Sequence, residues 1–237
     1  MPHTTIQENL ARISERIASA ANRSGRNADE ITLIAVSKTH PASAIQEAFD
    51  AGLRHFGENR VQEWEGKRNV IAHLPATWHL IGHLQSNKAA KAARSFRSID
   101  AVDDLALAQK LDRATSLPAP QRLRVLIEVH IGDEATKSGV SEAHLPEVAE
   151  KILPLQHLEL AGLMCIPPFL ENAQAVRPFF AKLRNLRDQL QSRLGYKLPV
   201  LSMGMSHDFE AAIQEGATEI RVGTALFGIR SAPQGIE

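Results

Sequence analysis

The chain has 237 residues, of which 43% are hydrophobic and 23% charged, and this composition is typical of a folded globular protein rather than a disordered one. Its 27 Lys and Arg residues balance 27 Asp and Glu residues, so it lacks the basic surplus of most nucleic-acid-binding proteins. The single cysteine, Cys165, excludes an internal disulfide and a cysteine-based zinc site, and it favours a reducing, cytoplasmic setting. The longest apolar runs have strand length, so we expect no membrane association.

The first 28 residues predict a helix that packs on the rest of the chain. Ile6, Leu10, Ile13 and Ile17 recur at helical spacing, with Thr4 or Thr5 as the N-cap. Acidic residues within this amphipathic segment argue against a secretory signal.

From residue 31 onward, short β-branched runs alternate with amphipathic helices. We expect strands at residues 31–36, 54–57, 78–82, 98–102, 124–130, 159–164, 200–204 and 219–223. Apolar residues at helical spacing mark helices between them: Ile45 and Phe49; Leu105, Ala108 and Leu111; Leu145, Val148 and Ile152; Phe179, Leu183, Leu186 and Leu190; Phe209 and Ile213. This α/β pattern predicts a single (β/α)8 TIM barrel with an extra N-terminal helix, a fold that typically has about 250 residues. An open doubly wound sheet is the alternative. No linker divides the chain, so we expect one domain over residues 1–237.

Lys38 follows the first strand, at the end of the barrel where such folds place their active sites. It shares side-chain parity with Ile34 and Val36, so its side chain is expected over the barrel mouth. A lysine at a partly desolvated mouth has a lowered pKa and forms a Schiff base with an aldehyde. The alternative is a strand-end lysine that reaches solvent.

The loops after the seventh and eighth strands predict an anion site. After the seventh strand, Gly204 lets the backbone approach a ligand, Ser206 is expected as the N-cap of the next helix, and Asp208 falls in its first turn. After the eighth strand, Gly223 and Thr224 open a second short helix. Two ordinary capped helices are the alternative. Opposite a strand-end lysine, however, the two loops indicate a small phosphorylated carbonyl compound as ligand.

Seven segments, in this order, resemble the pyridoxal phosphate homeostasis protein family. They are AVSKTHP, HFGENRVQE, WHLIGHLQSNK, TKSG, GLMCIPP, SMGMSHDFEAAI and RVGTALFG. The resemblance implies a single barrel similar to that of alanine racemase, which holds pyridoxal 5′-phosphate as an aldimine on Lys38. It also implies cofactor contacts from the segments that follow the last two strands, namely Met205, Ser206, Gly223 and Thr224. By analogy with the racemase barrel, Arg221 would approach the pyridine nitrogen.

The chain departs from this family pattern at two positions. Relatives often carry Pro where this chain has His83, and Tyr where it has Arg60. Neither position belongs to the lysine or phosphate segments, so the departures concern the rim of the pocket and whatever docks there.

Two further residues have both a functional and a structural interpretation. Asn59, after the second strand, either hydrogen-bonds the cofactor ring or caps a helix. His79, within the third strand, either stacks on or bonds to the cofactor, or is a core histidine bonded to a neighbouring strand. His79 and His83 lack the helical geometry of a metal-binding histidine pair, so we expect no metal.

The remaining candidates favour structural roles. Lys137 is either a second aldehyde acceptor or a solvated loop lysine. Lys88, Lys91, Arg94 and Arg97 recur every three residues, which is typical of a solvated helix face, and we expect no nucleic-acid binding there. Cys165 is expected to be a packed thiol.

These features favour a cofactor carrier over an enzyme, with no catalytic residue assigned. The expected function is intracellular vitamin B6 homeostasis by a monomer that supplies pyridoxal 5′-phosphate (PLP) to PLP-dependent apoenzymes. The alternative is a racemase of the alanine racemase type, which needs a second base, commonly a tyrosine from an added domain. Tyr196, the only tyrosine, precedes the seventh strand and is therefore expected at the opposite end of the barrel from Lys38. A lysine-dependent aldolase acting on a sugar phosphate is a third possibility.

Overall fold

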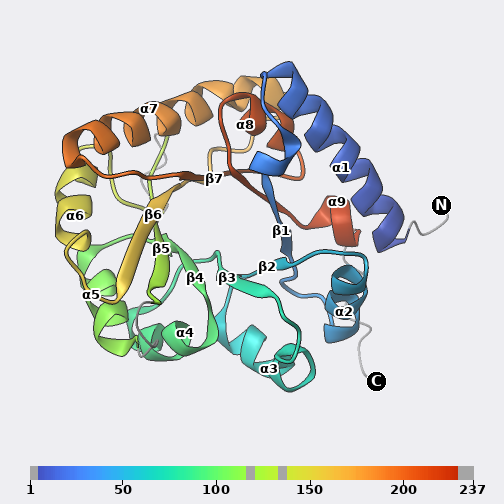
Figure 1. Cartoon of the computed structure of the whole chain (residues 1–237), viewed down its shortest axis with the longest axis horizontal. Coiled ribbons are helices and arrows are strands. Elements are labelled where there is room, and N and C mark those ends of the chain that lie inside the picture. Colours follow the sequence, from blue (N-terminus) through green and yellow to red (C-terminus); the bar gives the residue numbers. More distant parts are fainter. Residues whose placement is uncertain (1–4, 116–120, 133–137, 229–237) are drawn as a thin grey trace.

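Eight parallel strands close into a barrel in chain order, with β8 hydrogen-bonded to β1 (Figure 1). The computed structural model describes residues 5–115, 121–132 and 138–228. The strands are β1 (Thr32–Val36), β2 (His55–Glu58), β3 (Thr77–Leu80), β4 (Ser98–Val102), β5 (Leu123–Glu128), β6 (Leu158–Met164), β7 (Val200–Met205) and β8 (Glu219–Val222). The predicted TIM barrel is confirmed, and the predicted strand ends are displaced by one or two residues at most.

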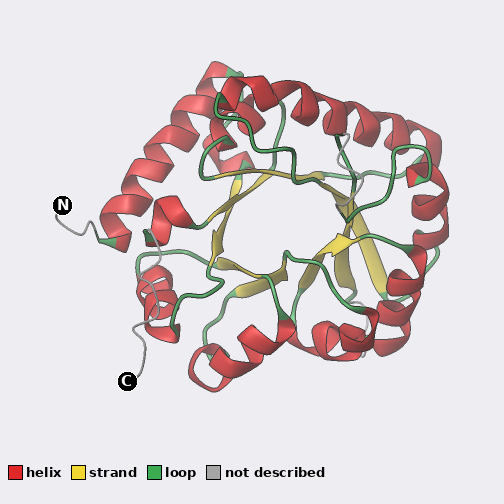
Figure 2. Cartoon of the chain, turned by 180° about the vertical axis from the view of Figure 1, so that it is seen from behind, coloured by secondary structure: helices red, strands yellow, loops and turns green. Residues whose placement is uncertain are grey.

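Helices surround the barrel on its outside (Figure 2). They are α1 (Ile6–Arg23), α2 (Ala42–Asp50), α3 (Val61–Ile71), α4 (Ala89–Ser95), α5 (Leu105–Ala114), α6 (Leu145–Ile152), α7 (Arg177–Leu194), α8 (Phe209–Gln214) and α9 (Thr224–Phe227). Short 3-10 turns are η1 (Ala28–Glu30), η2 (Ser86–Lys88) and η3 (Ala173–Val176). Among the described residues, no helix combines the length and the apolar character needed to cross a membrane.

Alternation along the strands divides the side chains into an outer and an inner set. Phe56 and Trp78 face outward into the layer beneath the helices, where their rings stack 5.3 Å apart. Gly57 faces inward, because a Cβ built there would lie 3.1 Å from the Ile34 side chain and 3.0 Å from that of Ile81. A side chain at position 57 would therefore displace its neighbours inside the barrel.

Helix α1 lies against α8 and α9 (Figure 1). It begins with a capping box, in which Thr5 accepts from the Glu8 N–H and Glu8 accepts from the Thr5 N–H. Arg16 binds both carboxylate oxygens of Glu210 on α8 at 2.9 Å. Asn9 donates to the carbonyl oxygen of Leu226 on α9 at 2.8 Å. The extra helix is thus attached to the two short helices that follow β7 and β8.

Candidate functional site

Lys38 lies in a tight turn at the end of β1. The His40 N–H donates to the Ser37 carbonyl at 3.1 Å to close this turn. Thr39 has φ of +66°, which is rare for a β-branched residue and indicates local strain. Lys38 is half-buried and lines a cavity of about 240 Å³ together with Asn59. The inward parity expected from Ile34 is supported by the Gly57 geometry.

An ion network around the buried Glu58, which we call the Glu58 network, contacts both residues that flank Lys38. Ser37 Oγ donates to Glu58 at 2.7 Å, and the Thr39 N–H donates to Glu63. Lys67 on α3 bridges the two carboxylates, with Nζ 2.9 Å from Glu58 and 3.1 Å from Glu63. Burial raises the pKa of Glu58, and Lys67 partly offsets this effect. Sequence reasoning missed this network; the four-residue spacing of Glu63 and Lys67 on one helix face was its available signal.

The loops after β7 and β8 approach each other across Ser206. Ser206 Oγ accepts from the Ala225 N–H at 3.3 Å. Gly204 has φ of +95°, and a Cβ there would lie 2.6 Å from the Ala212 Cβ, so only glycine lets α8 come this close to β7. Within the described parts of the chain, no acceptor is bonded to the backbone N–H of Ser206 or Thr224. These donors and the Ser206 and Thr224 hydroxyls form what we call the anion cradle.

The helix starts at the anion cradle differ in one respect from expectation. Helix α9 begins at Thr224 with Gly223 as N-cap, so the predicted second short helix does open at these two residues. Helix α8 begins at Phe209 with Asp208 as N-cap, so the predicted N-cap role of Ser206 is wrong. The reason is a turn in which Asp208 accepts the Met205 N–H at 2.6 Å and donates its own N–H to the Met205 carbonyl at 3.1 Å. This turn leaves Ser206 outside the helix, facing α9. Met205 itself is half-buried at the end of β7.

The Lys38 turn and the anion cradle are direct neighbours. The His40 ring stacks on Phe227 of α9, with centroids 4.7 Å apart. A Cβ at Gly223 would lie 3.4 Å from the Val36 Cβ, which places the two strand ends side by side. The Lys38 turn and the hydrogen-bond donors of the anion cradle therefore lie at the same end of the barrel.

Arg221 supplies a buried cation beneath this site. Its Nη1 donates to Ser202 Oγ and its Nη2 to the Cys165 carbonyl, both at 2.8 Å. Burial raises the pKa of both Asp208 and Glu128, and the nearby charge of Arg221 partly offsets this effect in each. Burial also raises the pKa of the Cys165 thiol to about 12, which agrees with the expected packed thiol.

His79 lies inside the barrel, where both of its ring nitrogens are used. Nδ1 is 3.1 Å from Asp100 Oδ2, and Nε2 is 3.0 Å from His55 Nδ1. The structure thus favours the core-histidine interpretation over contact with a ligand at the mouth.

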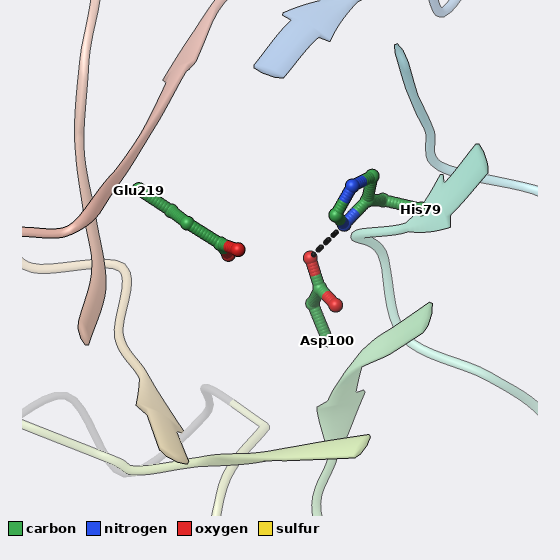
Figure 3. A group of neighbouring side chains, drawn as sticks. All are labelled: His79, Asp100 and Glu219. Atoms are coloured by element: carbon green, nitrogen blue, oxygen red, sulfur yellow. Dashed lines mark hydrogen bonds and ion pairs between the residues drawn. The ribbon is translucent and has the colours of Figure 1, made fainter. Parts of the chain in front are cut away.

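His79, Asp100 and Glu219 point toward one another from separate strands, and their ligand atoms lie within 4.8 Å (Figure 3). Sequence reasoning missed this buried cluster because β8 is far from β3 and β4 in the chain. Arg124 already binds Glu219 at 2.5 Å, and Ser98 donates to Asp100. Burial raises the pKa of Asp100, but His79, Arg124 and Ser98 together outweigh this effect and hold the pKa below its ordinary value. Burial and the Asp100 charge raise the pKa of Glu219. We interpret the cluster as an internal ion-pair network.

Other predicted residues fall at the periphery or elsewhere. Of the four cations predicted on one helix face, only Lys91 and Arg94 lie on α4, whereas Lys88 ends η2 and Arg97 follows α4. Lys91 pairs with Glu65 at 3.2 Å on exposed surface. Tyr196 lies between α7 and β7, at the opposite end of the barrel from Lys38. Lys137 lies outside the described residues.

Comparison with known proteins places this site in context. The family described as the N-terminal domain of alanine racemase matches residues 8–231. The pyridoxal phosphate homeostasis protein of Aquifex aeolicus is 47% identical over 224 residues, which cover 94% of this chain and 97% of that protein. The structure of PipY from Synechococcus elongatus PCC7942 with PLP bound is 43% identical, with a TM-score of 0.78, and covers 91% of this chain and 100% of PipY. Alanine racemase from Corynebacterium glutamicum shares the fold, with a TM-score of 0.66 at 18% identity, over 94% of this chain and 62% of the racemase.

Proposed function

This chain belongs to the pyridoxal phosphate homeostasis protein family, and from that premise we propose that its barrel mouth binds pyridoxal 5′-phosphate (PLP) in the service of intracellular vitamin B6 homeostasis. The observation that carries the proposal is the adjacency of the Lys38 turn and the anion cradle, given by the His40–Phe227 stack. PLP supplies an aldehyde, which condenses with a primary amine and releases one water, and a phosphate that carries close to two negative charges at neutral pH.

The donors of the anion cradle suit a phosphate group. The Ser206 and Thr224 N–H groups accompany two hydroxyls, and both loops end at the positive end of a short helix. Gly204 and Gly223 keep side chains away from the backbone at these two strand ends. We assign Ser206, Gly223 and Thr224 to the phosphate, with Met205 contributing to the wall beside it.

Lys38 is the proposed point of covalent attachment. Lys38 would hold PLP through Nζ, and the PLP aldehyde would supply the carbon for a carbon–nitrogen bond whose formation releases one water. The Glu58 network binds Ser37 and Thr39, and thereby restrains the backbone from which Lys38 extends. Asn59 lines the same cavity and is the proposed hydrogen-bonding partner of the ring.

The charge beneath the mouth favours a carrier over an enzyme. Arg221 is the buried group proposed to face the pyridine nitrogen, and a cation there disfavours protonation of that nitrogen. A ring without that proton is a weaker electron sink, so the site does not favour carbanion chemistry. The alternative is an amino-acid racemase, for which Tyr196 is at the wrong end of the barrel.

The wider setting is part of the same proposal. A single barrel domain, acting as a monomer in the cytoplasm, would pass PLP to PLP-dependent apoenzymes. The fully buried, unpaired Cys165 is compatible with a reducing compartment.

The test is the absorption spectrum of the purified protein, followed by borohydride reduction and peptide mapping. A lysine-bound PLP absorbs near the visible range, and reduction fixes it to the peptide that contains Lys38. The Lys38→Ala variant is expected to lose this band while keeping the wild-type circular dichroism. A colourless wild-type protein that gains no band with added PLP overturns the proposal. A Lys38→Ala variant that keeps the band, with the label on another peptide, overturns the assignment of Lys38 as the point of attachment. Alanine racemisation at about 1–1000 per second would favour the racemase alternative.

A further inference from the structure

A cavity of about 620 Å³ opens at the rim of the barrel, between the start of α3 and the loop that follows β3. We call it the rim cavity. It shares Asn59 and Arg60 with the smaller cavity that Lys38 lines, so the two cavities are neighbours. It lies beside β2 and β3, whereas the anion cradle lies at β7 and β8. The rim cavity is therefore a separate place for a ligand.

The walls of the rim cavity are cationic. Arg60 and Lys88 both line it, and none of the described residues in its wall carries a carboxylate. Neither side chain forms an ion pair or hydrogen bond with any residue that the structure describes. The nearby Asp103 is already bound, because His83 Nδ1 lies 2.9 Å from its carboxylate. Two cations without a counter-ion at one concave surface attract an anion.

Hydrogen-bond donors accompany these cations. Asn59, Gln62 and Gln85 also line the rim cavity, and each carries a side-chain amide that can donate hydrogen bonds. Helix α3 begins here with Arg60 as N-cap, and an arginine side chain has no acceptor with which to cap the first N–H groups. Gly82 keeps the opposite wall close, since a Cβ there would lie 2.6 Å from the Asn59 carbonyl oxygen. Donors thus surround a space that supplies little negative charge of its own.

We propose that the rim cavity binds a small organic anion through a carboxylate or phosphate group, held by Arg60 and Lys88. Both groups offer the several acceptor oxygens that a guanidinium and an ammonium require. The inference depends on the rim cavity alone and holds whether or not PLP occupies the Lys38 site.

The test is a titration of the PLP-loaded protein at constant ionic strength, in which NMR chemical shifts of the backbone amides report binding. Inorganic phosphate and succinate are the two probes, and they distinguish a phosphate site from a carboxylate site. We expect saturable shifts at residues 59–62 and 82–88 with at least one probe. Arg60→Gln and Lys88→Gln should each raise that dissociation constant about tenfold, the usual effect of losing one charged hydrogen bond. Arg94→Gln, which removes the same charge from exposed surface of α4, should leave it unchanged.

Three outcomes overturn the inference. The first is the absence of saturable shifts at the rim with either probe. The second is saturation only at residues 205–206 and 223–225, which would mean that the probes enter the anion cradle. The third is an equal loss of affinity in Arg94→Gln, which would mean that overall charge, not the rim cavity, determines binding. If the protein does not take up PLP, the same titration of the unloaded protein still tests binding at the rim cavity. The amides of the rim cavity and those of the anion cradle report binding at the two places separately.

Discussion

Lys67 Nζ on α3 lies 3.0 Å from the carbonyl oxygen of Ser37, the residue that immediately precedes Lys38. The same ammonium binds Glu58 and Glu63, and those two carboxylates accept from Ser37 Oγ and the Thr39 N–H. One largely buried side chain, that of Lys67, thus joins β2 and α3 to both sides of the Lys38 turn. Thr39 keeps its strained φ of +66° because the surrounding contacts hold it there.

Lys67→Met should destabilise the fold and slow PLP uptake together. Removing one partner from a buried ion pair costs about 3–5 kcal/mol, because Glu58 is left uncompensated. Urea denaturation measures the stability, and growth of the near-visible band after PLP addition measures uptake. Lys91→Met removes an exposed pair with Glu65 and should cost at most about 1 kcal/mol, with unchanged uptake.

If Lys67→Met does not fold, Glu63→Gln separates position from stability. This change keeps the Lys67–Glu58 pair but weakens the contact to the Thr39 N–H. Slower PLP uptake at near-wild-type stability is expected. Uptake at the wild-type rate in every folded variant of this network would show that it does not position Lys38.

The anion cradle should recognise the phosphate rather than the ring. Ser206→Ala and Thr224→Val each remove one hydroxyl, and a hydrogen bond to a charged group is worth about 1.5–3 kcal/mol, so PLP affinity should fall roughly ten- to hundredfold. The backbone N–H donors remain, so binding should persist. Neither substitution should change the affinity for pyridoxal much, because pyridoxal lacks the phosphate. Equal weakening of PLP and pyridoxal in equilibrium titrations would place the phosphate elsewhere.

The eight strands and the neighbouring strand-end loops were predictable because they depend on local patterns. Period-two runs locate the strands, and parallel strands in a barrel place all their following loops at one end. The N-cap of α8 was not predictable in the same way, because Ser206 and Asp208 are both good capping residues. The contact of Asp208 with the Met205 N–H decides between them.

The internal ion-pair network inside the barrel, or interior network, could not be predicted from the sequence for a different reason. His79, Asp100 and Glu219 meet only when the barrel closes, and no local spacing relates them (Figure 3). Lys67 reaches Ser37 across thirty positions of the chain. Contacts between residues that are distant in the chain therefore determine which polar side chains line the barrel mouth and which only hold those side chains in place.

Arg16→Met should loosen the anion cradle from outside the barrel. Arg16 binds Glu210 through two contacts of 2.9 Å and lies 4.4 Å from the ring centroid of Phe209. Because both residues are partly exposed, we expect a stability loss of about 1 kcal/mol. Backbone hydrogen exchange over residues 205–212 should accelerate, and PLP affinity should fall a few-fold. Arg193→Met, which removes an exposed pair with Glu150 on α6, is the matched control. Unchanged exchange over residues 205–212 would show that α1 does not restrain α8.

His55 should make the fold less stable as the pH falls below about 6.5. Burial, and then the charges of His79 and Arg124, lower the pKa of His55 to about 4, with Asp100 acting in the opposite direction. The folded pKa lies below the unfolded value, so the unfolded state binds the proton first. The stabilisation is therefore complete above pH 6.5 and is lost between pH 6.5 and 4. A shift of this size corresponds to at most about 3.4 kcal/mol, and we expect roughly 1–2 kcal/mol because His55 is only half-buried.

A comparison of the wild type with His55→Gln isolates this effect from the buried carboxyls. Glu58, Glu128, Asp208 and Glu219 have raised pKa values, so each becomes less destabilising as the pH falls, which is the opposite sign. These contributions are common to both proteins and cancel in the difference. Urea denaturation at pH 7.5, 6 and 5 should therefore show a steeper loss of stability in the wild type than in His55→Gln. His73→Gln, at an exposed position, should follow the wild-type profile. Parallel profiles for the wild type and His55→Gln would mean that the interior network takes up the His55 proton without cost.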